Sequence, residues 1–250
     1  EAGGSLKLEG KAVGAAENAN ITLSLSGSQL KFRDHALASL EVKADAALTD
    51  GGMTVHDVHA VAEGKSAVQL RGSLGWKDGL SWQADVKAAE LDPGLIAPDW
   101  PGAINAELRS QGRKTADSLA AAVQLDKLNG KLRGFPLQGS GTAAFDGSSL
   151  AVDGLRLQSG STFVQGSGTA NMAKELALSF KAGSDDLASL APQAGGSFRL
   201  EGAVSGTAQQ PAVSLNASGS KLRFQDHSLK ELKAAVKADL AADGQVDAEI

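Results

Sequence analysis

The chain has 250 residues, with 24 Lys and Arg against 29 Asp and Glu, which gives a formal net charge of −5. Because the basic residues are dispersed among acidic ones, with few aromatic side chains for base stacking, we expect no nucleic-acid partner. The sequence holds no Cys, no Tyr, seven Phe and three Trp. With so few large side chains, the chain is expected to bury its apolar surface thinly or to leave part of it for a ligand.

Short runs in which apolar and polar residues alternate recur along most of the chain. A period of two predicts strands with one apolar face and one solvated face. The residues predicted to share the apolar face and to line a groove are Leu6, Leu8, Ile21, Leu23, Leu25, Leu40, Val42, Val68, Leu70, Leu74, Leu80, Trp82, Val86, Ile104, Leu108, Val123, Leu125, Leu150, Val152, Leu176, Leu178, Phe180, Phe198, Leu200, Val213 and Leu215.

The links between these runs are short and contain residues that accept positive φ. The predicted hairpin turns are Asp50-Gly51-Gly52, Asp78-Gly79, Asn129-Gly130, Asp146-Gly147, Asp153-Gly154 and Asp243-Gly244. Parallel strands would need crossovers of a dozen or more residues, for which there is no room. The sequence therefore predicts an all-β, antiparallel meander with on the order of twenty strands, which must curl or split because open sheets rarely exceed about ten.

Two stretches, residues 89–102 and 184–196, interrupt the alternation. In the second, Asp186 is a predicted N-cap for a short helical turn over residues 187–190, which Pro192 would end. The equivalent turn in the first spans residues 91–97, with Pro93 in its first turn. We expect both to punctuate the sheet between repeats.

The sequence repeats itself. Residues 2–40 and 194–232 are near copies, and PGAINAELRSQG, from Pro101, begins a fainter copy, so the period is about 95 residues. We predict a first module over residues 1–100, a second over 101–193 and the start of a third over 194–250. The chain begins with Glu and lacks the ~20-residue apolar run of a membrane-spanning helix. We expect an internal fragment of a longer protein.

The polar motifs of the sequence predict neither a catalytic pair nor a metal site. Asp34-His35 and Asp226-His227 occupy the same repeat position, which favours a turn residue over a catalytic pair. His56 and His59 would face opposite sides of a strand unless a bulge intervened, so we expect no metal site.

Two further motifs have structural interpretations. GSGTA, at residues 139–143 and 166–170, lacks the following helix that a phosphate loop needs, and fits strand positions where the sheet bends or backbones approach. Adjacent Asp185 and Asp186 do not form the carboxylate pair of a glycosidase. We expect no cofactor and no enzymatic activity.

The stretch DLASLAPQAGGSFRLEGAVSGTAQQPAVSLNASGSKLRF joins a Leu-x-x-Leu-x-Pro turn, a Gly-led strand, a second Gly and a strand-opening Pro. Residues 128–170 add a run of strands between such markers. This order resembles the repeats of the TamB family, the inner-membrane-anchored component of the translocation and assembly module. The resemblance covers essentially the whole chain, although Ala19 replaces the proline found at Pro211.

The resemblance implies a long sheet curled into a taco-like hydrophobic trough in the periplasm, anchored to the inner membrane through a segment absent here. It also implies phospholipid acyl chains as cargo between the inner and outer membranes, and the outer-membrane barrel partner TamA, docked through absent parts. Three alternatives stay open: a chaperone-like assembly factor for outer-membrane proteins, a β-helical adhesin or stalk, and an apolar face packed as an ordinary core. Exposed strand edges further predict self-association of the fragment edge to edge.

Overall fold

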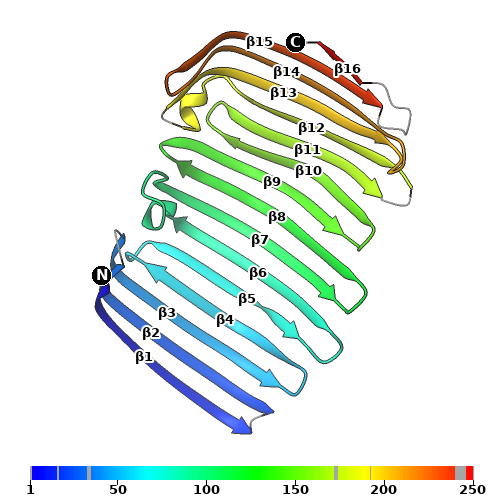
Figure 1. The fold of residues 1–250 in the computed structure, drawn as a ribbon. Helices are drawn as coiled ribbons and strands as arrows, with labels where there is room; N and C mark the ends of the chain where they lie inside the picture. The colour runs from blue at the N-terminus through cyan, green and yellow to red at the C-terminus, as the bar shows by residue number, and fades with distance from the viewer. Residues whose placement is uncertain are drawn as a thin grey trace. The chain divides into compact units, whose positions relative to one another are not determined.

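The computed structural model describes residues 2–15, 17–32, 35–171, 174–191, 193–239 and 246–249. These residues form sixteen strands and two 3-10 turns, in two compact units, Glu1–Gly134 and Phe135–Ile250 (Figure 1). In this described part, no helix is long and apolar enough to cross a bilayer.

The first unit is an antiparallel meander in which each strand pairs with the next in the chain. Its strands are β1 (Ala2–Ala15), β2 (Asn18–Phe32), β3 (His35–Thr49), β4 (Gly52–Ala62), β5 (Ser66–Gly75), β6 (Leu80–Leu91), β7 (Gly102–Lys114) and β8 (Leu119–Leu132). Between β6 and β7 lies the 3-10 turn η1 (Pro93–Leu95).

The second unit has the same plan. Its strands are β9 (Phe135–Phe145), β10 (Ser149–Ser159), β11 (Thr162–Asn171), β12 (Leu176–Ser184), β13 (Ala194–Gly206), β14 (Pro211–Phe224), β15 (His227–Asp239) and β16 (Val246–Glu249), with the 3-10 turn η2 (Leu187–Ser189) between β12 and β13. The predicted antiparallel meander is confirmed, and the antiparallel pairing excludes the β-helical adhesin or stalk.

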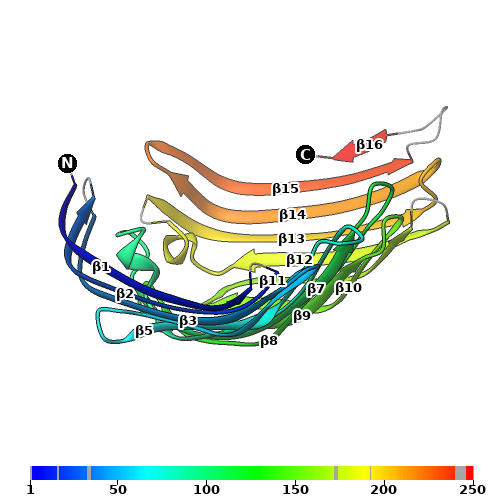
Figure 2. The same ribbon diagram turned by 90° about the horizontal axis from the view of Figure 1, so that it is seen from below.

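Sixteen described strands replace the predicted twenty or so because the strands are longer than expected, up to 15 residues in β2 and β3. Figure 2 shows β1, β2 and β3 of the first unit, and β13, β14 and β15 of the second, as long arcs. A β-bulge bends the strand that contains it, and bulges occur in both units.

Three of the predicted turns lie between strands: those at Asp50, Asp78 and Asp146. Two predictions were wrong. Asn129-Gly130 lies inside β8 and Asp153-Gly154 inside β10, where the register shifts by a bulge. A bulge uses the same positive φ as a hairpin turn, here +56° at Gly154, so the dipeptide does not distinguish the two. Asp243-Gly244 lies outside the described residues.

Both 3-10 turns form where the interruptions predicted them, although each is shorter than expected. Asp186 caps η2 by accepting a hydrogen bond from the backbone N–H of Ala188, as predicted. Pro93 opens η1, and Asp92 caps it. The predicted stop at Pro192 lies outside the described residues.

The near copies in the sequence adopt the same local geometry. Register shifts occur between Gly3 and Ser5 in β1 and between Gly195 and Ser197 in β13, which are equivalent positions of the two near copies. Across the following strand, Ser5 and Ser28 hydroxyls lie 2.8 Å apart, and the equivalent Ser197 and Ser220 hydroxyls 2.9 Å apart. The two copies therefore agree in the position of the bulge and in cross-strand pairing as well as in sequence.

Candidate functional site

One face of the first unit carries unbroken rows of apolar and small residues that run across all eight strands. Directly paired residues share a face of an antiparallel sheet, so the register defines each row. One row consists of Leu8, Leu25, Val42, Ala60, Val68, Ala88, Ala106 and Leu128. The next consists of Gly10, Leu23, Ala44, Val58, Leu70, Val86, Leu108 and Leu125.

The second unit carries the same kind of face. One of its rows consists of Gly139, Leu157, Val164, Ala182, Leu200, Ala217 and Ala234. Another consists of Ala143, Val152, Gly168, Leu178, Val204, Val213 and Ala238. We call these surfaces, one in each unit, the apolar faces.

The register brings the predicted groove-lining residues together on the apolar face of their own unit. Seventeen of them, Leu6 to Leu125 in the sequence analysis, lie in the first unit, and nine, Leu150 to Leu215, in the second. Their contact with lipid stays a prediction.

Sequence reasoning missed residues that join the apolar faces after a bulge. Val58 follows the register shift after Val55, and Leu128 follows the one after Leu125, so each lies three residues from its apolar neighbour and still pairs within an apolar row. A period-two search breaks at such positions. The repeat alignment offered a signal for others, since Leu30 is identical to its equivalent Leu222.

The apolar faces are open to solvent. Among described hydrophobic residues only Ala170 is buried, at 7% exposure, while Leu8 is 64% and Leu23 43% exposed. A packed core would bury such leucines almost completely and surround each with several neighbours. The structure therefore presents exposed apolar surface running across successive strands, of the kind that marks interaction sites.

The opposite face of each unit is polar. In the first unit one of its rows is Glu9, Ser24, Lys43, His59, Gln69, Lys87, Glu107 and Lys127. Arg109 donates to Asp126 through Nε at 2.7 Å and Nη2 at 2.6 Å, and these hydrogen bonds lower the pKa of Asp126. Hydrogen bonds from Gln69 and Arg71 likewise lower the pKa of Asp57. Such exposed pairs stabilise the fold only slightly but keep this face hydrated.

Glycines on the apolar face make room for aromatic rings. A side chain on Gly112 would collide with the Trp82 indole, and one on Gly202 with the Phe180 ring. Each ring covers the glycine directly opposite on the next strand, which shields the exposed backbone. The indole N–H of Trp82 donates to the Ser110 hydroxyl at 3.0 Å, so this aromatic residue adds no unsatisfied donor to the face.

A hollow of about 520 Å³ lies on the apolar face of the first unit, beside η1. It is lined by Gly3, Leu30, Lys31, Ala36, Leu37, Leu40, Ala60, Ala62, Ser66, Val68, Leu91, Asp92, Leu95 and Ile96, and we call it the η1 hollow. Of these, Leu40 and Val68 were predicted from the sequence as groove-lining residues. The other lining residues were not.

Hydrogen bonds fix η1 beside the strands. The buried Ser66 hydroxyl donates to the Glu90 carbonyl at 3.1 Å and accepts from the Asp92 N–H at 3.1 Å. The Asp92 carboxylate accepts from the N–H groups of Gly94 at 2.9 Å and Gly102 at 2.8 Å. These bonds hold both ends of the segment, so Leu95 and Ile96 have a defined position at the rim.

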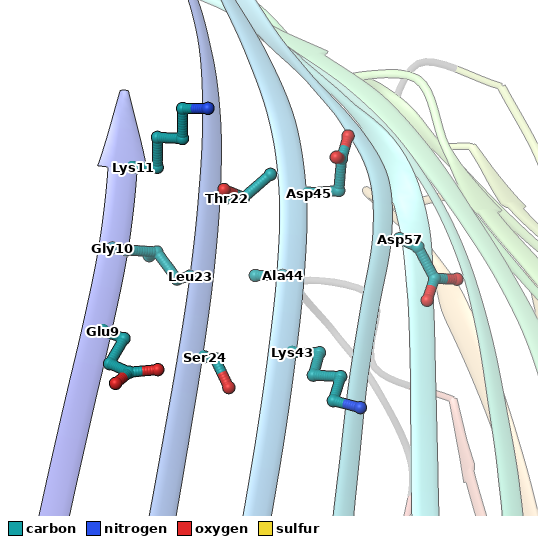
Figure 3. Close-up of a pocket in the computed structure, with 10 residues that line it drawn as sticks. All are labelled: Glu9, Gly10, Lys11, Thr22, Leu23, Ser24, Lys43, Ala44, Asp45 and Asp57. Atoms are coloured by element: carbon teal, nitrogen blue, oxygen red, sulfur yellow. The ribbon is translucent and has the colours of Figure 1, made fainter. Parts of the chain in front are cut away.

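A second hollow, of about 430 Å³, lies on β1–β4 and is lined largely by the polar rows (Figure 3). Figure 3 shows Glu9, Ser24 and Lys43 in one row, Lys11, Thr22 and Asp45 in another, and Gly10, Leu23 and Ala44 between them. Its side chains carry both signs of charge, and Asp57 already accepts from Gln69 and Arg71. Because charges of both signs line this hollow, it favours neither an anionic nor a cationic ligand.

The remaining motifs occupy structural positions. His56 is the extra residue of the bulge in β4 and His59 follows it in the same strand. Both are exposed, and among the described residues no group of three or more His, Cys, Asp or Glu could hold a metal. Asp226 lies in the β14–β15 turn and His227 begins β15, whereas the Asp34-His35 pair lies outside the residues whose side chains are described.

Both GSGTA copies lie in strands, as predicted: one in β9 and one in β11. In the second copy, a side chain on Gly168 would collide with the carbonyl of Ala177 on the neighbouring strand. The two adjacent aspartates are also engaged in the fold, since Asp185 pairs with Arg199 at 2.6 Å and Asp186 caps η2.

Comparison with known proteins places the chain in a family. No solved structure matches it significantly. It is 23% identical over 233 residues to the translocation and assembly module subunit TamB of Haemophilus influenzae, covering 88% of this chain and 17% of that protein. The chain thus spans less than a fifth of this relative. The family described as "TamB, N-terminal domain" matches residues 56–250, more than three quarters of the sequence. The chain therefore belongs to the TamB family.

Proposed function

We propose that the chain is a non-enzymatic segment of a translocation and assembly module, and that its apolar faces conduct phospholipid acyl chains between the inner and outer membranes. The observation that carries this proposal is the unbroken apolar row across successive strands, exposed to solvent and backed by a polar face. Flexible hydrocarbon chains need a surface that is apolar along its length but demands no fixed shape. Leu, Val, Ala and Gly provide such a surface.

Family membership supports the cellular setting. The name of the Haemophilus relative assigns that protein to a translocation and assembly module. For this chain we propose a periplasmic location, attachment to the inner membrane through another part of the full protein, and TamA as partner. A lipid that covers this exposed apolar surface would gain about 25 cal/mol for each Å² of apolar area that it removes from water.

The test is whether lipid occupies the apolar faces. A photoreactive p-benzoylphenylalanine at Leu23 should crosslink to phospholipid in a Gram-negative host, whereas the same residue at Ser24, on the polar face, should not. Phospholipid should also co-purify with the chain and appear in its mass spectra. Crosslinks from position 23 to unfolded outer-membrane proteins, with no lipid adduct, would contradict the proposal and favour the assembly-factor alternative.

A further inference from the structure

The η1 hollow differs from the rest of the apolar face in having a rim. Leu95 and Ile96 leave the plane of the sheet with η1 and line the hollow together with strand residues such as Leu37 and Val68. Its volume of about 520 Å³ lies within the ~300–1,000 Å³ typical of small-molecule sites. A ligand here would be enclosed on more sides than one lying elsewhere on the sheet.

The polar groups around the η1 hollow leave one charge without a partner. Ser66 and Asp92 use their side chains in the hydrogen bonds that fix η1. Lys31 is the only basic residue of the lining, and in the described part of the chain its ammonium has no hydrogen-bond or ion-pair partner. An apolar hollow with an available cation matches an amphiphile with an anionic head.

Part of this arrangement recurs at the equivalent repeat position in the second unit. A hollow of about 400 Å³ there is lined by Leu222 and Leu229, the equivalents of Leu30 and Leu37, and by Arg223, the equivalent of Lys31. Lys221 and Lys230 also line it, but no residue of a 3-10 turn does, so it lacks the rim of the η1 hollow. A Cβ added to Gly195 would lie 3.4 Å from an Nη atom of Arg223, so the guanidinium lies over the start of β13. Positive charge at this repeat position therefore accompanies the apolar pair in both copies.

We propose that the η1 hollow is a discrete binding site for one acyl chain of an anionic phospholipid, with Lys31 contacting the headgroup phosphate. This proposal rests on the proposed lipid-conducting function and adds a preferred binding position for lipid on the apolar face. Hydrocarbon fills the space between η1 and the strands, where every lining side chain except Lys31 is apolar, small or already hydrogen-bonded. The Lys31 ammonium can donate a charge-assisted hydrogen bond to the headgroup phosphate. A zwitterionic headgroup carries its own cation next to the phosphate, so it gains less from this contact.

The experiment uses phosphatidylglycerol with a diazirine in one acyl chain, added to the 250-residue chain below one lipid per protein, followed by irradiation and peptide mapping. Label should concentrate on peptides carrying β3 and η1. Ile96→Asp should reduce that label about tenfold, which corresponds to ~1.4 kcal/mol of binding. Because Ile96 is 81% exposed, the change leaves the fold intact. Leu190→Asp, at the equivalent C-cap of η2, is the matched control and should leave the label unchanged.

The headgroup contact is tested with phosphatidylcholine bearing the same diazirine chain. The wild type should prefer phosphatidylglycerol, Lys31→Gln should remove that preference, and Lys127→Gln on the polar face should keep it. Label spread evenly over the apolar strands, or an Ile96→Asp variant labelled like the wild type, would overturn the site while leaving the proposed function standing. Absence of label from both apolar faces would overturn the proposed function itself.

Discussion

Replacing Leu23 by Arg distinguishes an open lipid-bearing face from a packed core. Leu23 is 43% exposed, so the fold buries only about half of a side chain whose full burial contributes ~1.5–3 kcal/mol. The arginine stem can lie along the face while its head reaches water. We therefore expect a loss of about 1 kcal/mol and a fall in Tm of about 2–4 °C.

Lipid binding should respond far more strongly. A guanidinium among acyl chains cannot be hydrated, and its burial costs several kcal/mol. With p-benzoylphenylalanine at Ala44, directly opposite residue 23 on the next strand, lipid crosslinking should disappear in Leu23→Arg. Leu215→Arg should behave alike at its own level of the second unit.

Ser24→Arg is the matched control, because Ser24 lies on the polar face between Glu9 and Lys43. It should change neither Tm nor crosslinking, and Asn216→Arg should be equally silent. Thermal unfolding followed by circular dichroism, together with the crosslinking yield, gives both quantities on the same samples. If Leu23→Arg lowers the free energy of unfolding by more than about 4 kcal/mol, the scale of a core truncation, then the apolar face is a packed core and the reasoning is refuted.

Other features of the fold give further expectations. Gly168→Ala should destabilise the second unit by about 1–3 kcal/mol, since φ is +128° and the new Cβ meets backbone, whereas Gly166→Ala, with its nearest atom at 3.6 Å, should be tolerated in the same urea titration. Asp92→Ala should cost the first unit about 1–2 kcal/mol in chemical denaturation, because it removes the cap of η1. Hydrogen bonds from Arg109 lower the folded-state pKa of Asp126 below 3.8, so the stability they confer is present above pH 3.8 and is lost as pH falls through the lower folded value; Asp126→Asn should flatten this acid limb of the stability curve. The chain should also associate edge to edge, and light scattering that shows a strict monomer at all concentrations would contradict this.

The strands, and the face of the sheet on which each side chain lies, were predictable because both depend on local alternation of apolar and polar residues. Leu23 and Ser24 alternate in a strand without a bulge, so period two assigns them to opposite faces correctly. Turn positions were less predictable, since Gly154 supplies the positive φ of a bulge inside β10 where a hairpin was expected. The choice between bulge and hairpin depends on pairing with the neighbouring strands, which local sequence does not contain.

The hollow was not predictable from alternation because its rim is built from a turn. Ile96 belongs to no strand, and its place depends on the Ser66 and Asp92 hydrogen bonds between segments some 26 residues apart. Asp92 as a cap was within reach of the sequence, since Pro93 follows it at the first helical position. The direction in which the capped turn projects over the strands is a property of the assembled sheet.

The repeat length itself has a physical basis in the meander. η1 follows six strands, β1–β6, and η2 follows a further six, β7–β12. In an antiparallel meander each strand reverses the chain, so only an even number of strands returns it to the edge from which a module began. Strands of about a dozen residues with short turns then give a period near 95 residues, and each of these two modules ends in a 3-10 turn capped by an aspartate. A change of module length by one strand would move the turn to the other edge, away from the residues equivalent to Leu30 and Leu37. An even count therefore lets duplication of one module repeat both the apolar face and the capped turn at its end.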